Sequence, residues 1–263
     1  MSNSVQAVSL ADCLQDRDAL RAVLPANVPE LTESVGVFEN TWCALDLPGQ
    51  PAPVAWQRNR DAHGFSVAVR YPAPFSRVKL PLGFDLEARY DAQDRSLRLT
   101  ELFLTRNVHG RYHLMGRIGE VDLTTVETAR ESLDTMTLSS ARLVITGNAG
   151  FIAKTAGGFF GVDPDEARRD AAVAADQRAA MLDKFAESMP PWLFDAGGQQ
   201  ELAALLRDYP HRGGTLSIEL PDSPAFPFFR VYRFAVLGEI PTEAVWTKEL
   251  QGLVLSLFWQ PGT

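Results

Sequence analysis

A strict alternation of apolar and charged residues is the feature that most constrains how this chain folds. It occupies residues 84–90, FDLEARY, and is typical of a strand with one buried and one solvated face. An aspartate-containing turn follows, because aspartate side chains bond nearby backbone groups and compete with strand pairing. Strand-like runs return at 97–104 and 112–118. The sequence therefore predicts a meander of three antiparallel strands across 82–118.

Helical spacing of apolar residues marks two other parts of the chain. A first helix is expected at 8–24, ended by the prolines that follow it. A long helical section is expected at about 148–209, where Asp163 is a favourable N-cap and Pro164 suits the first helical position. The helix after Asp163 is predicted to turn one face inward, made of Ala167, Ala171, Ala174, Arg178, Leu182 and Phe185. A shorter helix at 199–209 is predicted to bury Leu202, Leu205, Leu206 and Tyr209.

The remaining segments complete an α+β fold. Further strands are expected at 35–71, 137–146, 214–220 and 251–259, and a further helix at 122–133. The stretch 226–237 fits either a helix or an apolar strand. We therefore expect a curved, mainly antiparallel β-sheet with a helical insert packed on one face. The chain is expected to form a single domain over 1–263, with an N-terminal subregion at 1–80 and the helical insert at about 148–209.

The charge balance excludes some classes of partner. Lys and Arg number 25 against 33 Asp and Glu, which gives a formal net charge of −8. Because a phosphate backbone attracts clustered cations and no Lys/Arg-rich run occurs, nucleic acid is not expected as a partner. No stretch reaches the roughly 20 apolar residues that span a bilayer, so no transmembrane segment is expected. No basic region followed by an apolar core opens the chain, so we expect either a cytoplasmic protein or a chain whose leader has been removed.

The chain has two cysteines, Cys13 and Cys43, and two interpretations of them stay open. They form a disulfide that closes a loop of about 30 residues, worth ~3 kcal/mol. Alternatively they are unpaired thiols, one on the first helix and one buried near Trp42. Two cysteines alone do not decide between an oxidising and a reducing compartment.

The sequence contains no complete catalytic or cofactor-binding motif. Residues 145–155, ITGNAGFIAKT, resemble a phosphate-binding loop. Asn148 and Ala153, however, occupy the positions where glycine is needed for the backbone to close around a phosphate. The carboxylates at 163–166 are explained by helix capping and the helix dipole. We therefore expect no bound cofactor.

One polar cluster is a candidate for a dispersed active site. His109 and His113 lie four residues apart, which places both imidazoles on one face of a strand, and Arg106 and Arg111 lie beside them. Gly110 interrupts the strand pattern, no Cys or third His lies nearby in sequence, and Asp122 or Glu120 would have to complete a ligand set, so no metal site is expected. The alternative is that these are polar residues at an exposed turn.

Aromatic residues gather on both sides of the helical section. They are Phe151, Phe159, Phe160, Trp192, Phe194, Phe226, Phe228 and Phe229. Helices that lie across an amphipathic sheet can leave an apolar cleft, so these side chains are candidates for binding an apolar ligand. The alternative is that they form the core between the helices and the sheet.

Several runs across roughly 82–230 resemble a family of bacterial envelope proteins. They are LEARYDAQDRSLRLTELFL, LMGRIGEVDL, SARLVITGNAGFIAKTAGGFFGVDPDEAR and LLRDYPHRGGTLSIELPDSPAFPFFRV. Hairpins that alternate with G-x-(I/L)-x-x-V-D-L steps and short helices are similar to those of AsmA/YdgA-like periplasmic proteins. The resemblance implies a curved antiparallel sheet, a periplasmic location, and a role in handling lipids or assembling the envelope. It implies no catalytic residues, and the first 80 residues and the lack of a visible membrane anchor depart from the family pattern.

These patterns predict a non-catalytic bacterial envelope protein. We expect it to bind an apolar, lipid-like ligand or a protein partner through its sheet and helical insert. The alternatives are an enzyme with a dispersed site around Arg106, His109 and His113, and an oligomeric structural scaffold. A periplasmic location is expected, with a cytoplasmic location as the alternative.

Overall fold

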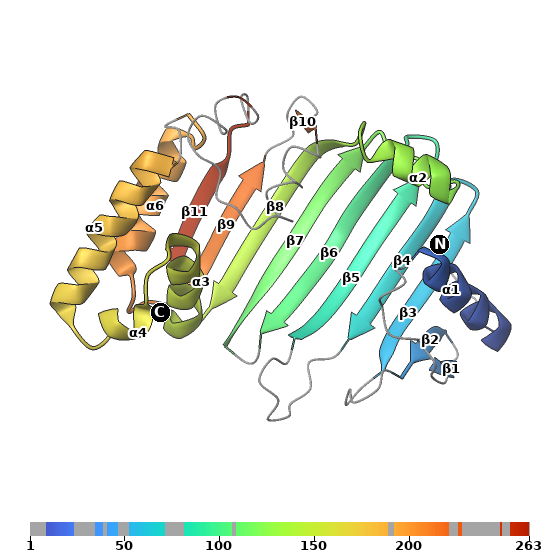
Figure 1. The fold of residues 1–263 in the computed structure, drawn as a ribbon, viewed down its shortest axis with the longest axis horizontal. Coiled ribbons are helices and arrows are strands. Elements are labelled where there is room, and N and C mark those ends of the chain that lie inside the picture. The colour runs from blue at the N-terminus through green and yellow to red at the C-terminus, as the bar shows by residue number, and fades with distance from the viewer. Residues whose placement is uncertain are drawn as a thin grey trace.

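The structure of the chain is a computed structural model (Figure 1). It describes residues 9–23, 35–38, 41–46, 53–71, 82–106, 109–188, 192–220, 226–227, 248 and 253–262. Within these residues the fold is mixed α+β, built on a large, curved, open antiparallel sheet of 11 strands with helices packed around it. This is the fold class that the sequence predicts.

The strands follow one another across the sheet almost in sequence order. Their bounds are β1 Val35–Phe38, β2 Trp42–Leu45, β3 Val54–Asp61, β4 Gly64–Tyr71, β5 Leu82–Asp91, β6 Ser96–Arg106, β7 Gly110–Gly119, β8 Thr137–Gly147, β9 Gly214–Leu220, β10 Phe226–Pro227 and β11 Ser256–Pro261. From edge to edge the order is β1-β2-β3-β4-β5-β6-β7-β8-β9-β11, and the two-residue β10 pairs with β8. The polypeptide therefore runs up and down through neighbouring antiparallel strands, most of which are joined by short connections.

Strands β5, β6 and β7 are the three strands predicted at 82–118. Asp91 closes the first of their turns, where its Oδ1 accepts hydrogen bonds from the N–H groups of Gln93 and Asp94. Asp61 closes the β3–β4 turn in the same way. The prediction of an aspartate turn between the first two strands of the meander is confirmed.

Two β-bulges keep apolar residues on one face of the sheet. In β6 the register shifts between Leu99 and Leu102, so both pair with residues that share one face of β7. In β8 a second shift keeps Leu138 and Ala141 on that same face. A bulge adds one unpaired residue, bends its strand and increases the local twist, so these two sites contribute to the curvature of the sheet.

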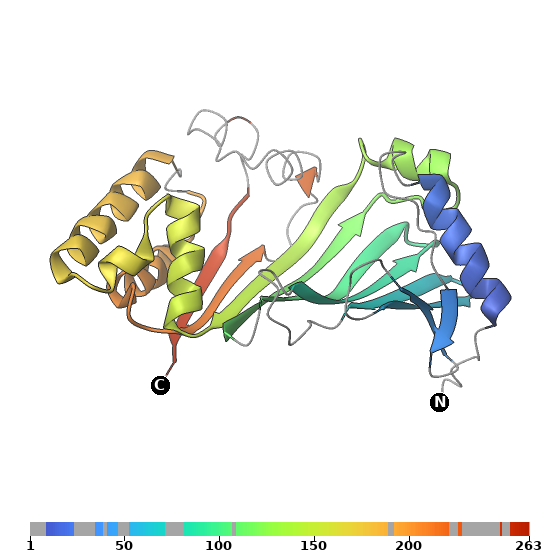
Figure 2. The same ribbon diagram turned by 60° about the horizontal axis from the view of Figure 1, so that its bottom comes forward.

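The described helices all stand on one side of the sheet (Figure 2). They are α1 Leu10–Val23, α2 Val126–Ser132, α3 Ala149–Phe160, α4 Pro164–Ala167, α5 Ala171–Ser188 and α6 Ala196–Asp208. Helices α1 and α2 lie toward the N-terminal end of the sheet, and α3 to α6 lie at the β8–β11 end. The middle strands thus lie between two separate groups of helices.

Polar side chains cap the helices of the second group. Asp163 accepts a hydrogen bond of 2.9 Å from the N–H of Asp165, and Pro164 is the first residue of α4, as predicted. Asn148 caps α3 and Asp195 caps α6 in the same manner. Each cap satisfies an N–H group that has no partner inside its helix.

The long helix predicted after Asp163 is interrupted. Helix α4 ends at Ala167 and α5 begins at Ala171, because Asp170 starts a new helix between them. The Asp170 carboxylate accepts from the N–H of Ala172, and its carbonyl accepts from the N–H of Ala174. The helical phase is therefore reset after residue 170.

This break changes which face of the helix is buried. Ala167 and Ala174 are buried as predicted, whereas Ala171 and Leu182 are exposed, so their assignment to the inward face was wrong. Met181 occupies the fully buried place instead. The shorter helix that follows does bury Leu202, Leu205, Leu206 and Tyr209, as predicted.

Three other boundaries differ from the predictions. Helix α2 begins at Val126 rather than at 122, because Thr125 forms a capping box with Thr128. The last strand runs over 256–261 rather than 251–259. Of the ambiguous stretch 226–237, the pair 226–227 is strand, and the rest lies outside the described residues.

Most of the buried apolar side chains form two clusters of very different size, and Tyr90 and Val121 are buried outside both. The larger one lies between the sheet and α3, α5 and α6, and it includes Met181, Leu206 and Trp259. The smaller one lies beneath α1 and consists of Cys13, Cys43, Leu45 and Trp56. We call these the helical core and the N-terminal core.

Candidate functional site

One face of the sheet is apolar along its whole width. A single row of paired residues from β3 to β11 illustrates this: Trp56, Val69, Leu86, Leu102, Leu114, Leu143, Ile218 and Leu257. Trp56 belongs to the N-terminal core, and Leu257 belongs to the helical core. Because paired residues share a face, the residues in the middle of this row face the same side as the helices.

The middle strands contribute nine apolar residues to this face, which we call the central apolar face. They are Val67 on β4, Leu86 and Ala88 on β5, Leu97, Leu99 and Leu102 on β6, and Leu114, Gly116 and Ile118 on β7. All nine are half-buried. Among the residues that the structure describes, none of them belongs to either core or packs against it.

One row of the central apolar face contains its two smallest residues, Ala88 and Gly116. In this row Val67, Ala88, Leu99 and Gly116 pair in succession across four strands. Leucines 86, 102 and 114 border the row on one side, and Leu97 and Ile118 border it on the other. Ala88 and Gly116 thus leave room above the sheet between rows of larger side chains.

Two arginines border the central apolar face at β3. Arg58 is paired in register with Val67, and Arg60 with Phe65, so both arise from the apolar face. The Asp16 carboxylate on α1 neutralises Arg58, with an N···O separation of 2.7 Å. Arg60 is exposed and, among the described residues, has no ion-pair partner. One uncompensated positive charge therefore stands at the edge of the apolar face.

The opposite face of the sheet is polar and solvated. Ion pairs link strands there. Arg142 of β8 pairs with Glu219 of the neighbouring β9 at 2.8 Å, and Arg89 of β5 pairs with Asp61 at the end of β3 at 2.7 Å. Such exposed pairs contribute about 0–1 kcal/mol each. This face resembles an ordinary water-facing sheet surface.

The polar cluster predicted around β7 divides between a turn and the polar face. His109 precedes β7, is exposed and bonds through Nδ1 to the Asn148 side chain at 3.1 Å. Arg111 and His113 alternate with Tyr112, whose ring packs against Phe151 on the apolar side, so both point to the polar face. The backbone of Arg106 ends β6, and its side chain lies outside the described residues. The two histidines are therefore not brought together around a common cavity.

Most of the predicted aromatic site residues lie in the helical core. Phe151, Phe160, Phe194 and Phe226 are buried there, and the half-buried Trp192 packs against them. The side chain of Phe159 and all of Phe228 and Phe229 lie outside the described residues. The structure therefore places these side chains between the helices and the sheet, and their role in binding a ligand stays a prediction.

The phosphate-loop lookalike is a strand-to-helix connection. Asn148 caps α3 instead of opening a loop, and the exposed Lys154 forms an ion pair with Asp165 at 3.6 Å. Within the described part of the chain, no group of three or more His, Cys, Asp or Glu residues is arranged to hold a metal ion.

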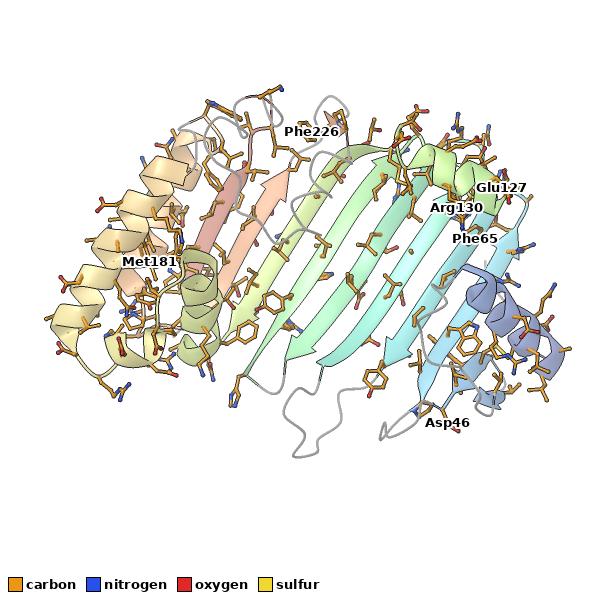
Figure 3. The ribbon with its side chains drawn as sticks, in the orientation of Figure 1. Asp46, Phe65, Glu127, Arg130, Met181 and Phe226 are labelled. Carbon is orange, nitrogen blue, oxygen red and sulfur yellow. A yellow bond between two sulfur atoms is a disulfide. The ribbon has the colours of Figure 1, made fainter. Side chains whose placement is uncertain are left out.

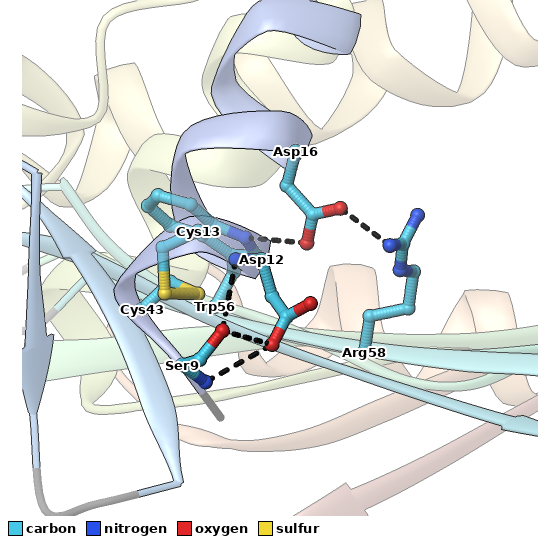
Figure 4. The surroundings of a disulfide bond; sticks show 7 residues. All are labelled: Ser9, Asp12, Cys13, Asp16, Cys43, Trp56 and Arg58. Atoms are coloured by element: carbon cyan, nitrogen blue, oxygen red, sulfur yellow. Dashed lines mark hydrogen bonds and ion pairs between the residues drawn. A yellow bond between two sulfur atoms is a disulfide. The ribbon is translucent and has the colours of Figure 1, made fainter.

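Of the two interpretations of the cysteines, the structure shows the disulfide. Cys13 and Cys43 are joined with an S–S distance of 2.05 Å, and both are buried. The bond ties α1 to β2 and therefore to the N-terminal end of the sheet (Figure 4). Beside it, Asp16 also accepts a hydrogen bond from Trp56 Nε1 at 3.2 Å.

Sequence reasoning missed both the central apolar face and its arginines. The signal was present in VAWQRNRD, where Trp56, Arg58 and Arg60 alternate on one face of the strand. It was also present in the three-residue spacing of Leu99 and Leu102, which a bulge converts into a shared face.

Comparisons with known proteins assign no family to the chain. No family model, no curated protein and no solved structure matches the chain. In the described residues, no helix is both long and apolar enough to cross a membrane.

Proposed function

We propose that this chain is a non-catalytic component of the bacterial cell envelope that binds an apolar, lipid-like ligand on its central apolar face. The observation that supports the proposal is the face itself. Nine apolar residues on four adjacent strands stay half-buried and pack on neither core of the described chain. Contiguous apolar surface of this kind is typical of a binding site, because leaving it in water costs free energy.

The position of the helices supports the same proposal. They stand on the apolar side of the sheet toward its two ends, and the middle strands lie between them (Figures 1 and 2). A ligand that lies on the middle strands is therefore flanked by rigid, packed elements at both ends. Apolar ligand sites are usually preformed concave surfaces of this type.

A location in the periplasm is part of the proposal. The Cys13–Cys43 disulfide supports it, because such bonds persist in oxidising compartments and are rare in the reducing cytoplasm. The resemblance of residues 82–230 to AsmA/YdgA-like periplasmic proteins points in the same direction. Labelling of the two thiols in whole cells, with and without prior reduction, tests the compartment directly.

The placement of the polar cluster does not favour the alternative of an enzyme. His109 lies exposed before β7, whereas Arg111 and His113 point to the polar face, away from the apolar rows. We therefore propose the binding function and not an enzymatic one.

The test is a pair of matched substitutions on the two faces of the sheet. Ala88→Phe adds a bulky ring to the row of the central apolar face that contains Ala88 and Gly116. Ala68→Phe places the same side chain on the polar face of the neighbouring strand. Organic extraction of each purified protein, followed by mass spectrometry, measures the apolar molecules that it holds. Titration with a fluorescent hydrophobic probe measures the affinity of the emptied protein.

We expect Ala88→Phe to lower both the extracted ligand and the probe affinity, and Ala68→Phe to change neither. Equal behaviour of the two variants would contradict binding at this face. Absence of any extractable or exchangeable apolar molecule in the unmodified protein would contradict the lipid-like ligand and leave a protein partner as the occupant.

A further inference from the structure

The charges around the central apolar face specify the chemistry of its ligand further. Among the described side chains on the apolar face of β3 to β7, the charged ones are Arg58 and Arg60. Arg58 already has a partner, because Asp16 lies 2.7 Å away and is itself held by the indole N–H of Trp56. Arg58 thus helps to fix α1 on the sheet.

Arg60 differs from Arg58 because its guanidinium group is uncompensated. It is exposed and forms no ion pair with any described residue. The neighbouring Asp61 points to the other face, where it is paired with Arg89 at 2.7 Å. An arginine in this position donates hydrogen bonds in a fork geometry that matches a carboxylate or a phosphate.

Arg60 also lies beside the central apolar face. It is paired with Phe65, which shares a face of β4 with Val67, where the row through Ala88, Leu99 and Gly116 begins. Figure 3 labels Phe65 near this end of the sheet, and its ring centroid lies 5.3 Å from that of Tyr90. Neighbouring strands lie about 4.8 Å apart, so the four gaps from β3 to β7 span roughly 19 Å of apolar surface. A charged group followed by this length of apolar surface matches an amphiphile with one anionic end.

On the basis of the proposed function, we infer that the ligand is a long-chain fatty acid, with its carboxylate at Arg60 and its hydrocarbon chain across the central apolar face. A single uncompensated cation matches a single negative charge. The net charge of −8 of the whole chain repels an anionic membrane surface or a headgroup with several charges, so a ligand with a single negative charge fits best.

The test uses two probes that share a hydrocarbon chain and differ in charge: oleate and its neutral methyl ester. Affinities are measured by displacement of a fluorescent hydrophobic probe from delipidated protein. The variants are Arg60→Gln, which removes the charge, and Arg60→Lys, which keeps it. Arg98→Gln is the control, because Arg98 is equally exposed, has no ion-pair partner among the described residues, and lies on the polar face opposite Arg89.

We expect Arg60→Gln to weaken oleate binding roughly two- to fivefold, which is the scale of one exposed charge-assisted contact. Methyl oleate binding should stay unchanged in this variant. Arg60→Lys should recover most of the oleate affinity, and Arg98→Gln should alter neither probe. Circular dichroism of each variant confirms that the sheet is intact.

The outcomes separate this inference from the proposed function. If Ala88→Phe removes the binding of both probes while Arg60→Gln leaves oleate unaffected, the site stands and the carboxylate contact is overturned. If neither probe binds the unmodified protein, both proposals fail. If detergent-dispersed phosphatidylglycerol binds with the same Arg60 dependence and oleate does not, the fatty acid is overturned in favour of a phospholipid.

Discussion

The two ends of the sheet are covered by helices in different ways. At the β8–β11 end, α3 to α6 and the adjoining strands bury 19 residues in one cluster, with no disulfide among the described residues there. At the β1–β3 end, α1 covers a cluster of four buried residues, two of which are the bonded cysteines. Because apolar burial scales with the size of the core, the large end is held by packing, and the small end needs a covalent tether.

The two ends of the sheet share one polar contact between sheet and helix. At both ends a tryptophan of the sheet donates its indole N–H to an aspartate of the covering helix. Trp56 donates to Asp16 of α1 at 3.2 Å, and Trp259 donates to Asp208 of α6 at 2.9 Å. The two ends therefore share this polar contact and differ in core size and in the disulfide.

Loss of the disulfide should produce the largest effect. Replacing both Cys13 and Cys43 by serine removes a closure of about 30 residues, which the chain-entropy treatment values at about 3–4 kcal/mol. We expect amide hydrogen exchange to accelerate in α1, β1 and β2 and to stay slow in α6. Equal loss of protection in α6 would show that the two ends are one cooperative unit.

Truncation inside the large core should come next. Met181→Ala leaves a cavity at a fully buried site and should cost about 3 kcal/mol of unfolding free energy. Leu182→Ala, one residue further along α5, is the matched control, because Leu182 is 46% exposed and its loss should cost less than about 0.5 kcal/mol. Urea denaturation measures both values, and similar costs would contradict the break in helical phase at 168–170.

The tryptophan contacts should differ in their dependence on the disulfide. Asp16→Ala removes the acceptor of Trp56 and the partner of Arg58, and should cost about 1–2 kcal/mol. Asp208→Ala removes the acceptor of Trp259 and should cost about 1 kcal/mol. Thermal denaturation of each variant, with and without the disulfide, shows whether the loss of stability depends on the covalent link between α1 and β2. The Asp16 effect should shrink once α1 is untethered, whereas an Asp208 effect that shrinks equally would argue against separate ends.

The smallest effect should be the pH response of the helix caps. Hydrogen bonds from the N–H of Gly198 and then from the Ser256 hydroxyl hold the pKa of the Asp195 carboxyl below its ordinary value. The hydroxyl and then the N–H of Ser9 do the same for Asp12 at the start of α1. Because the folded pKa is lowered, each carboxylate stabilises the fold above an unfolded pKa of about 3.9, and this stabilisation is lost as the pH falls through the folded value.

Asp195→Asn tests this response because asparagine still caps the helix and does not titrate. We expect the midpoint of thermal unfolding to decrease more steeply below about pH 4 in the unmodified protein than in this variant. Asp12→Asn provides the parallel measurement at the other end. Parallel pH profiles for the variant and the unmodified protein would contradict a lowered pKa at the cap.

The strands and helices could largely be predicted because their signals are local. The alternation at 84–90, the aspartate turn after it, and the cap at Asp163 each act within a few residues. The interruption at Asp170 was missed, because an alanine-rich sequence is compatible with one continuous helix and with two helices in succession. One shifted residue then moved the buried place from Leu182 to Met181.

The candidate site could be predicted only in part. The aromatic residues were expected to be either ligand contacts or core, and burial places Phe151, Phe160 and Phe226 in the helical core. The central apolar face was not anticipated, because an apolar residue in a strand does not reveal what covers it. That information depends on where the helices lie, and α1 and α3 to α6 are separated from β4 to β7 by long stretches of sequence.

The alternation by itself determined that this chain forms strands with one apolar face, since side chains of a strand point to opposite sides by geometry alone. It also determined which residues of each strand share that face, apart from the two bulges. Only the tertiary structure decided that the described helices gather toward the two ends of the sheet, with neither Leu99 nor Leu114 in the cores that they cover. Helix packing depends on contacts between residues far apart in sequence, so the apolar face at the centre is a property of the assembled fold.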